Sequence, residues 1–165
     1  MLDGRWWSMI PPAERSGYVD GFGDCYVYDA KGKSTAGGWT ASHFVQAVAA
    51  YYRQHENERT TPVSTILRQI NRTGKPRPTL KGGEEWKEAH AYYDGLWWRG
   101  SSAAEQLGYI EGYLSCYSNE MTSQGTVFSK AAPEYVNLIT SHIKAHPQSD
   151  DEKLAIILRR FRDRQ

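Results

Sequence analysis

The chain has 165 residues, of which 39% are hydrophobic and 24% charged, enough apolar mass for one domain or for two small units that share a core. Its 20 basic and 19 acidic residues give a net charge of +1, which argues against a dedicated binder of nucleic acid or of anionic membranes. The apolar runs are far shorter than a membrane-spanning helix, so we expect no membrane insertion. The unusual counts are 6 Trp, 11 Tyr and 15 Gly.

An internal repeat with an offset of 91 residues organises the chain. Between residues 3–26 and 94–117, eleven of 24 positions are identical (Asp, Gly, two Trp, Ala, Glu, Gly, Tyr, Gly, Cys and Tyr), where chance gives roughly one or two. The offset continues without a gap to the last helix of each copy. We therefore predict two halves, 3–72 and 94–163, joined by a Pro- and Gly-containing linker over 73–93 whose end could form a short helix.

The first long element of each half is predicted to be a helix, over residues 12–29 in the first copy. Its repeated face has the spacing i, i+3, i+4, i+7, i+8, which is one side of an α-helix. The residues are Tyr18, Gly21, Phe22, Cys25 and Tyr26, matched by Tyr109, Gly112, Tyr113, Cys116 and Tyr117. Gly17 and Gly21, like their copies Gly108 and Gly112, lower helix propensity by about 1 kcal/mol each. Their presence in both copies predicts a close helix crossing.

Two further helices follow in each half. The second runs from about residue 40 to His55, with its copy ending near His146, and the third has apolar stripes over 63–70 and 154–161. No stretch shows sustained strand alternation. The predicted fold is all-α: two homologous three-helix halves packed as a single domain about a pseudo-twofold axis.

The two cysteines, Cys25 and Cys116, leave two interpretations open. They could form a disulfide, which would indicate an oxidising compartment, or they could be two buried thiols that act as small apolar residues.

The tryptophan pairs Trp6, Trp7, Trp97 and Trp98 stand just before the first helix of each half. Large aromatic side chains are mostly buried, so they are expected to cap the core. The functional alternative is an exposed aromatic surface that grips a protein partner or a sugar, and these four residues are the candidate binding surface.

The ionisable residues at matched positions are expected to be structural. His55 and His146 suit the end of their helices, and a metal shared between them is the less favoured interpretation because neither has a neighbouring His or Cys. Asp20 and Glu111 lie off the aromatic face, so a solvated helix face is expected rather than an acid–base pair. The C-terminal arginines are expected to complement the helix terminus. No nucleophile, phosphate-loop or dinucleotide motif is present, so we expect no enzymatic activity, cofactor or metal.

Three features carry a resemblance to a known family. They are the segment Gly17-Tyr18-Val19-Asp20-Gly21, the run of residues 48–55 that ends in His55, and Ile66-Leu67. The second half repeats them as residues 108–112, His146-Pro147 and Ile157-Leu158. In this pattern the chain resembles a tandem duplication of the Rap/Tai immunity-protein family, whose members neutralise type VI secretion amidase toxins in the bacterial periplasm.

The resemblance implies a helical protein that covers a toxin's active site and performs no chemistry itself. It also implies a periplasmic or secreted location, with the signal peptide absent from the given sequence. We therefore expect a monomeric, non-enzymatic binding protein with a protein partner and without nucleic acid. A small-molecule or glycan-binding module that uses the Trp pairs between the halves is the alternative. An enzyme with an unrecognised site is a third.

Overall fold

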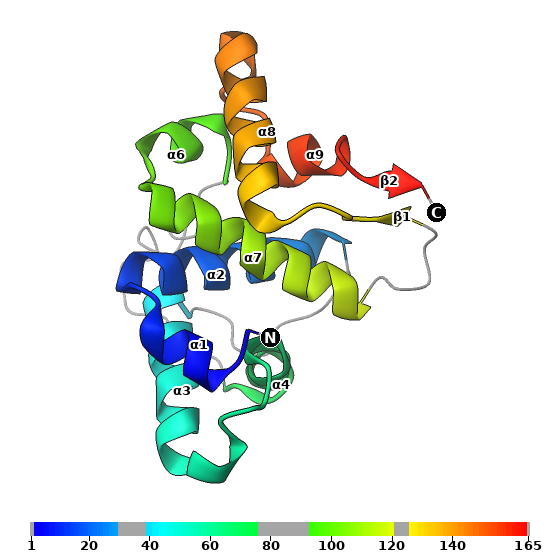
Figure 1. Ribbon diagram of the computed structural model, residues 1–165. Helices are drawn as coiled ribbons and strands as arrows, with labels where there is room; N and C mark the ends of the chain where they lie inside the picture. The colour runs from blue at the N-terminus through cyan, green and yellow to red at the C-terminus, as the bar shows by residue number, and fades with distance from the viewer. Residues whose placement is uncertain (1, 30–38, 76–92, 121–125, 165) are drawn as a thin grey trace.

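The computed structural model describes residues 2–29, 39–75, 93–120 and 126–164, and its fold is all-α, as predicted (Figure 1). The first half contains α1 (Gly4–Met9), α2 (Pro12–Asp24), a π-helical turn (Cys25–Asp29), α3 (Ala41–Gln54), a 3₁₀ turn (Glu56–Glu58) and α4 (Val63–Thr73). The second half contains α6 (Gly95–Gly100), α7 (Ala103–Glu120), α8 (Ala132–Ala145), a 3₁₀ turn (Pro147–Ser149) and α9 (Leu154–Arg159).

Smaller elements complete the described chain. The strands β1 (Thr126–Val127) and β2 (Asp163–Arg164) form an antiparallel pair of two residues each. Of the predicted short helix at the end of the linker, only Tyr93 lies inside the described residues. Within those residues no helix has both the length and the apolar character needed to cross a bilayer.

The tryptophan motifs form short helices of their own, which the sequence analysis did not predict. The side chain of Asp3 caps α1 by accepting hydrogen bonds from the backbone N–H groups of Arg5 (3.0 Å) and Trp6 (3.2 Å). Asp94 caps α6 in the same way, accepting from the N–H of Trp97 at 2.9 Å. Among the described residues, each of the two predicted halves therefore contains one α-helix more than the predicted three.

The helices α2 and α7 lie side by side at the centre of the molecule, with α1, α3 and α4 on one side and α6, α8 and α9 on the other (Figure 1). Their backbones meet at glycines, so a Cβ atom placed on Gly21 would lie only 1.8 Å from the carbonyl oxygen of Tyr109. A Cβ atom added to any of the other three glycines would also lie too close to a carbonyl oxygen of the facing helix. The distances are 1.9 Å from Gly112 to Tyr18, 2.1 Å from Gly108 to Glu14 and 2.2 Å from Gly17 to Glu105. The predicted close helix crossing is confirmed.

A disulfide joins α7 to the turn after α2, one helical turn beyond Gly21 and Gly112. Cys25 and Cys116 are bonded, with their Cα atoms 6.0 Å apart, and both are fully buried. Of the two interpretations left open by the sequence, the structure therefore has the disulfide and not the free thiols.

Short backbone contacts tie the start of each half to its last helix. The N–H of Val63 donates to the carbonyl oxygen of Leu2 (3.0 Å), and the N–H of Leu154 donates to that of Tyr93 (2.8 Å). Leu2 precedes Asp3, the cap of α1, and contacts the first residue of α4. Tyr93 precedes Asp94, the cap of α6, and contacts the first residue of α9. Leu2 and Tyr93, which lie 91 residues apart, thus make matching backbone contacts.

The glycine contacts predict a large difference between two neighbouring substitutions in α2. Gly21→Ala should lower the free energy of unfolding by about 1–3 kcal/mol or more, because the added methyl group meets backbone that cannot move aside without separating the helices. Gly23→Ala is the matched control. Its Cβ would meet no atom within 4 Å beyond its chain neighbours and the nearby backbone of its own helix, so it should be neutral or stabilise the protein by up to about 1 kcal/mol. Urea unfolding of both variants with the disulfide intact tests this, and equal effects would contradict it.

Candidate functional site

The candidate Trp surface is mostly part of the core. Trp7 and Trp98 are 3% and 2% exposed, so they cannot belong to an exposed binding surface, and the prediction is corrected for them. Trp6 and Trp97 are half-buried and pack on the core through Tyr18 and Tyr109, with ring centroids 5.2 Å and 5.4 Å apart. The rings are held by neighbouring aromatic side chains, and they cap the core as the favoured interpretation expected.

The two matched histidines lie apart from any cluster of metal ligands. His55 and His146 are exposed at the ends of α3 and α8, where they stack on Tyr51 and His142 with centroids 4.4 Å and 4.5 Å apart. Their Nδ1 atoms lie 3.0 Å and 2.9 Å from the carbonyl oxygens of the same two residues. No group of three His, Cys, Asp or Glu side chains within the described ranges could hold a metal ion.

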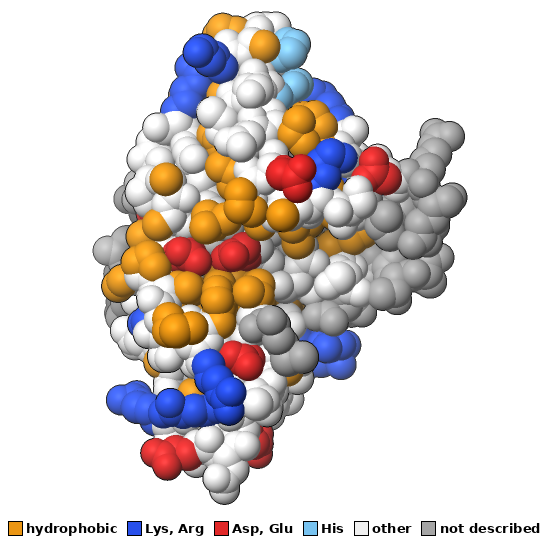
Figure 2. Space-filling view, viewed as in Figure 1, with side chains coloured by type: hydrophobic (Ala, Val, Ile, Leu, Met, Phe, Trp, Pro, Cys, Tyr) orange, Lys and Arg blue, Asp and Glu red, His pale blue; other side chains and the backbone are white. Residues whose placement is uncertain are grey.

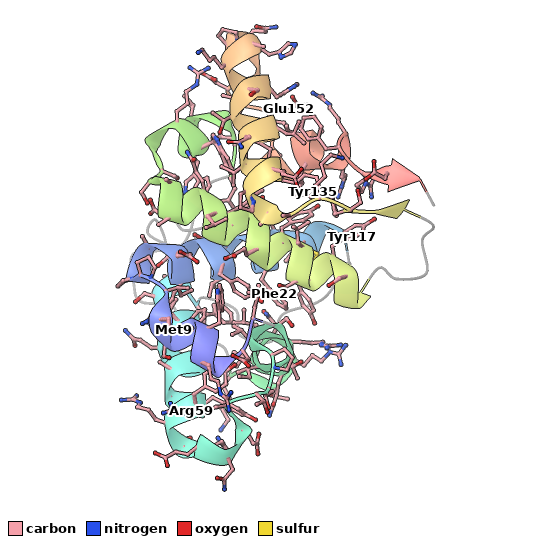
Figure 3. All side chains as sticks on the ribbon, in the orientation of Figure 1. Met9, Phe22, Arg59, Tyr117, Tyr135 and Glu152 are labelled. Atoms are coloured by element: carbon pink, nitrogen blue, oxygen red, sulfur yellow. A yellow bond between two sulfur atoms is a disulfide. The ribbon has the colours of Figure 1, made fainter. Side chains whose placement is uncertain are left out.

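The basic C-terminal end makes contacts within its own half. Arg160 forms an ion pair with Glu152, and His142 lies against both of them. Figure 3 shows Glu152 beside α8, near α9. Arg162 donates a hydrogen bond to the hydroxyl oxygen of Tyr117 (3.1 Å). The arginines therefore join α8, α9 and α7.

The matched carboxyl groups Asp20 and Glu111 differ most from expectation. They do not lie on a solvated helix face: both are partly buried at the crossing of α2 and α7. Burial raises the pKa of Asp20 to about 7, which the hydrogen bond from Tyr93 partly opposes and the nearby Asp24 and Glu105 reinforce. The hydroxyl of Tyr93 donates to Oδ1 of Asp20 at 2.5 Å.

A second carboxyl pair, Glu14 and Glu111, lies on the same crossing. Burial raises the pKa of Glu111 to about 7, and the neighbouring Glu14 raises it further. The pKa of Glu14, which is 9% exposed, is also raised by burial. Two carboxyl groups in contact cannot both ionise cheaply, so burial and their mutual repulsion both favour the protonated form of this pair.

The tyrosines beside these carboxyl groups complete the candidate site. The hydroxyl of Tyr109 donates to Oδ2 of Asp24 at 2.6 Å, and burial raises its pKa far above the ordinary value. Tyr18, the matched residue, is also fully buried, and burial raises its pKa. We define the candidate site as the carboxyl groups on α2 and α7 together with the tyrosines that contact them. Its members are Glu14, Tyr18, Asp20, Asp24, Tyr93, Tyr109 and Glu111. Its residues were missed as a group because a single helix pattern does not show which second helix covers the other face.

The arrangement can hold protons, but it is not built like an exposed catalytic dyad. Tyr18, Tyr109 and Glu14 are buried. Asp20 and Asp24 accept hydrogen bonds from tyrosine hydroxyls, and Glu111 contacts Glu14. No family model, curated protein or solved structure matches the chain.

The raised pKa values predict that stability falls as pH rises. The folded pKa of Asp20 is about 7 against an ordinary 3.8, so its stabilising contribution is complete below about pH 4 and is lost as pH rises through 7. The free energy of unfolding should fall by on the order of 2 kcal/mol between pH 5 and pH 8. Asp20→Asn should flatten this decline, because a neutral amide oxygen still accepts the hydrogen bond from Tyr93.

Chemical unfolding at several pH values measures this effect. The exposed Glu56→Gln is the control and should keep the wild-type profile. If the profile of Asp20→Asn ran parallel to that of the wild type, the raised pKa would be contradicted.

Proposed function

We propose that this chain is a non-enzymatic protein of the bacterial periplasm or exterior that binds a partner enzyme and blocks it, as an immunity protein does. The partner would be covered by a surface of this chain, and no bond would be made or broken by the chain itself. The observation that supports the binding role is a set of large apolar side chains that remain exposed to solvent although the protein has a buried hydrophobic core.

The exposed apolar side chains support a protein partner. Met9 is 78% exposed at the end of α1, and Leu96 is 62% exposed on α6. Figure 2 shows hydrophobic side chains gathered over α1, α2 and α7, with two acidic side chains among them and basic ones at the margin. Apolar surface of this kind is typical of protein-binding sites. Trp7 and Trp98 offer no exposed ring to a sugar, so the glycan-binding alternative has less support.

The buried disulfide supports the compartment. Disulfides form and persist in oxidising environments and are rare in the bacterial cytoplasm. The bond between Cys25 and Cys116 closes the central helix crossing of the protein. A protein that needs this bond for full stability fits the periplasm or the exterior.

The proposal includes a tandem duplication, with the halves 3–72 and 94–163 related by a pseudo-twofold axis between α2 and α7. Contacts that recur with an offset of 91 residues support it. Gly17 meets Glu105 while Gly108 meets Glu14, and the bridge of Asp3 to Pro62 has its counterpart in Asp94 to Lys153. Each half supplies the central helix that the other half packs on, which favours a monomer.

The disulfide predicts a difference between protein made in the two compartments. Protein recovered from the periplasm of the native host should contain no reactive thiol after unfolding, and cytoplasmic protein should contain two. Loss of the bond should lower the free energy of unfolding by roughly 2–4 kcal/mol, because the unfolded chain gains freedom. Thiol labelling before lysis and urea unfolding with and without reductant measure both effects. Free thiols in protein from the native host would contradict the compartment.

The binding role predicts one stoichiometric partner. The full chain used as bait in the source organism should recover an enzyme that native mass spectrometry shows in a fixed ratio, and the purified chain should inhibit that enzyme. Met9→Asp should weaken the complex about tenfold or more, because it places a charge in an apolar contact. Ile156→Asp, at a less exposed apolar residue on α9, is the control. A partner that is bound without inhibition, or no stoichiometric partner, would contradict the proposal.

A further inference from the structure

Two pairs of carboxyl groups lie at the crossing of α2 and α7. Glu14 on α2 contacts Glu111 on α7, and Asp20 on α2 lies close enough to Glu105 on α7 for their charges to repel. By the offset of 91 residues in the sequence, Glu14 matches Glu105 and Asp20 matches Glu111. The surroundings of the two pairs can therefore be compared position by position.

Both acids of the pair Asp20 and Glu105 receive hydrogen bonds from the chain itself. The hydroxyl of Tyr93 donates to Oδ1 of Asp20 at 2.5 Å. The backbone N–H and the hydroxyl of Ser102 donate to Oε2 of Glu105 at 2.7 Å and 2.8 Å, as in a capping box at the start of α7. This pair needs no donor from another molecule.

The pair Glu14 and Glu111 lacks both of these donors. The residues that stand 91 positions before Ser102 and Tyr93 are Pro11 and Leu2. Proline has no N–H group and the side chain of leucine has no polar atom, so neither can donate in the same way to a carboxyl group. Glu14 and Glu111 are in contact with each other instead.

No cation of the described residues neutralises this pair. The sequences of α2 and α7 contain a single basic residue, Arg15, and its Nε atom donates to the carbonyl oxygen of Trp7 at 2.9 Å. The ion pairs between described residues include neither Glu14 nor Glu111. A positive group from another molecule would therefore find two carboxyl groups that have no counter-ion, and charge-assisted hydrogen bonds are among the strongest in proteins.

An exposed apolar side chain lies close to this pair along the chain. Met9 is the last residue of α1, and Glu14 is in the first turn of α2, which begins at Pro12. Met9 is 78% exposed, whereas the matching position holds Gly100, which has no side chain. Figure 2 shows hydrophobic side chains over α1, α2 and α7 with acidic side chains among them. A surface of this composition is complementary to a positive group in apolar surroundings.

We propose that Glu14, Glu111 and Met9 form the contact point for one arginine or lysine side chain of a protein partner. The positive charge offsets the repulsion between the two carboxylates, and the carbon atoms of the same side chain pack on Met9. This inference rests on the proposed function and names the chemistry of the partner's surface, which is a basic residue in apolar surroundings. The pair Asp20 and Glu105 already has its donors, so one copy of the partner binds.

A small cation tests the contact point without the partner enzyme. Benzamidinium carries a positive amidinium group on an aromatic ring, and benzamide is a neutral compound of nearly the same shape. In NMR titrations of the isotope-labelled, disulfide-bonded chain at pH 8 and low ionic strength, benzamidinium should shift the backbone amide signals of Met9, Glu14 and Glu111. Benzamide should leave them unchanged. No shift with benzamidinium, or equal shifts with both compounds, would overturn the proposal.

Matched variants separate this contact from general attraction to acidic residues. Glu14→Gln should lower the affinity for benzamidinium about tenfold, because it removes a charge-assisted hydrogen bond. Glu105→Gln, the same change at the matching position, should keep the wild-type affinity. Glu111→Gln should repeat the effect of Glu14→Gln and replaces it if that variant does not fold. An equal loss in Glu14→Gln and Glu105→Gln would overturn the proposal.

The titration and the proposed function can fail separately. The titration contains no enzyme, so a partner that is bound without inhibition would contradict the blocking role and leave the benzamidinium result standing. A negative titration would remove this contact point and leave the blocking role to be judged by the capture experiment.

Discussion

The backbone contact between α2 and α7 is the constraint on which the rest of the structure depends. Four glycines let carbonyl oxygens of one helix reach the Cα atoms of the other, far closer than any side chain would allow. Helices this close leave no room for a layer of apolar side chains between them. Residues at the edges of the contact therefore pack directly on the backbone of the neighbouring helix. The spacing of Gly17 and Gly21 resembles the small-residue pattern that brings helices together in membranes. Here the same device serves within one chain.

The close crossing explains why acidic groups became buried. A residue such as Asp20 lies off the aromatic face of α2, and in an isolated amphipathic helix that position would meet water. Because α2 packs on α3 with one side and on α7 with another, the position falls at the edge of a second interface. The tyrosines of the aromatic face then supply hydroxyl groups where the carboxyl groups need them, as Tyr109 does for Asp24. The centre of the protein therefore combines aromatic packing with hydrogen bonds from tyrosine hydroxyls to carboxyl groups.

Much of the fold could be predicted from the sequence because periodicity and repetition reinforce each other. The start of α2 at Pro12 and the end of α3 before His55 follow from single-helix rules. The close crossing follows from the glycines that recur in both copies of the repeat. The short helices at the Trp pairs were missed, although Asp3 and Asp94 are typical N-cap residues, because six residues show no hydrophobic period. The burial of Asp20 and Glu111 could not be predicted, since a one-helix pattern does not state how many neighbours that helix has. The function of the chain was outside the reach of composition and motif.

The position of the disulfide has a consequence for the integrity of the molecule. Cys25 and Cys116 lie 91 residues apart, so the bond closes a covalent ring that includes the whole of α3 and α4, the linker and α6. A protease that cuts this ring once, anywhere between the two cysteines, opens the ring but releases no fragment. The nicked product keeps its mass apart from one added water, and α2 and α7 stay joined at the glycine contact. The chain would in this way survive a first cut as a single covalent molecule.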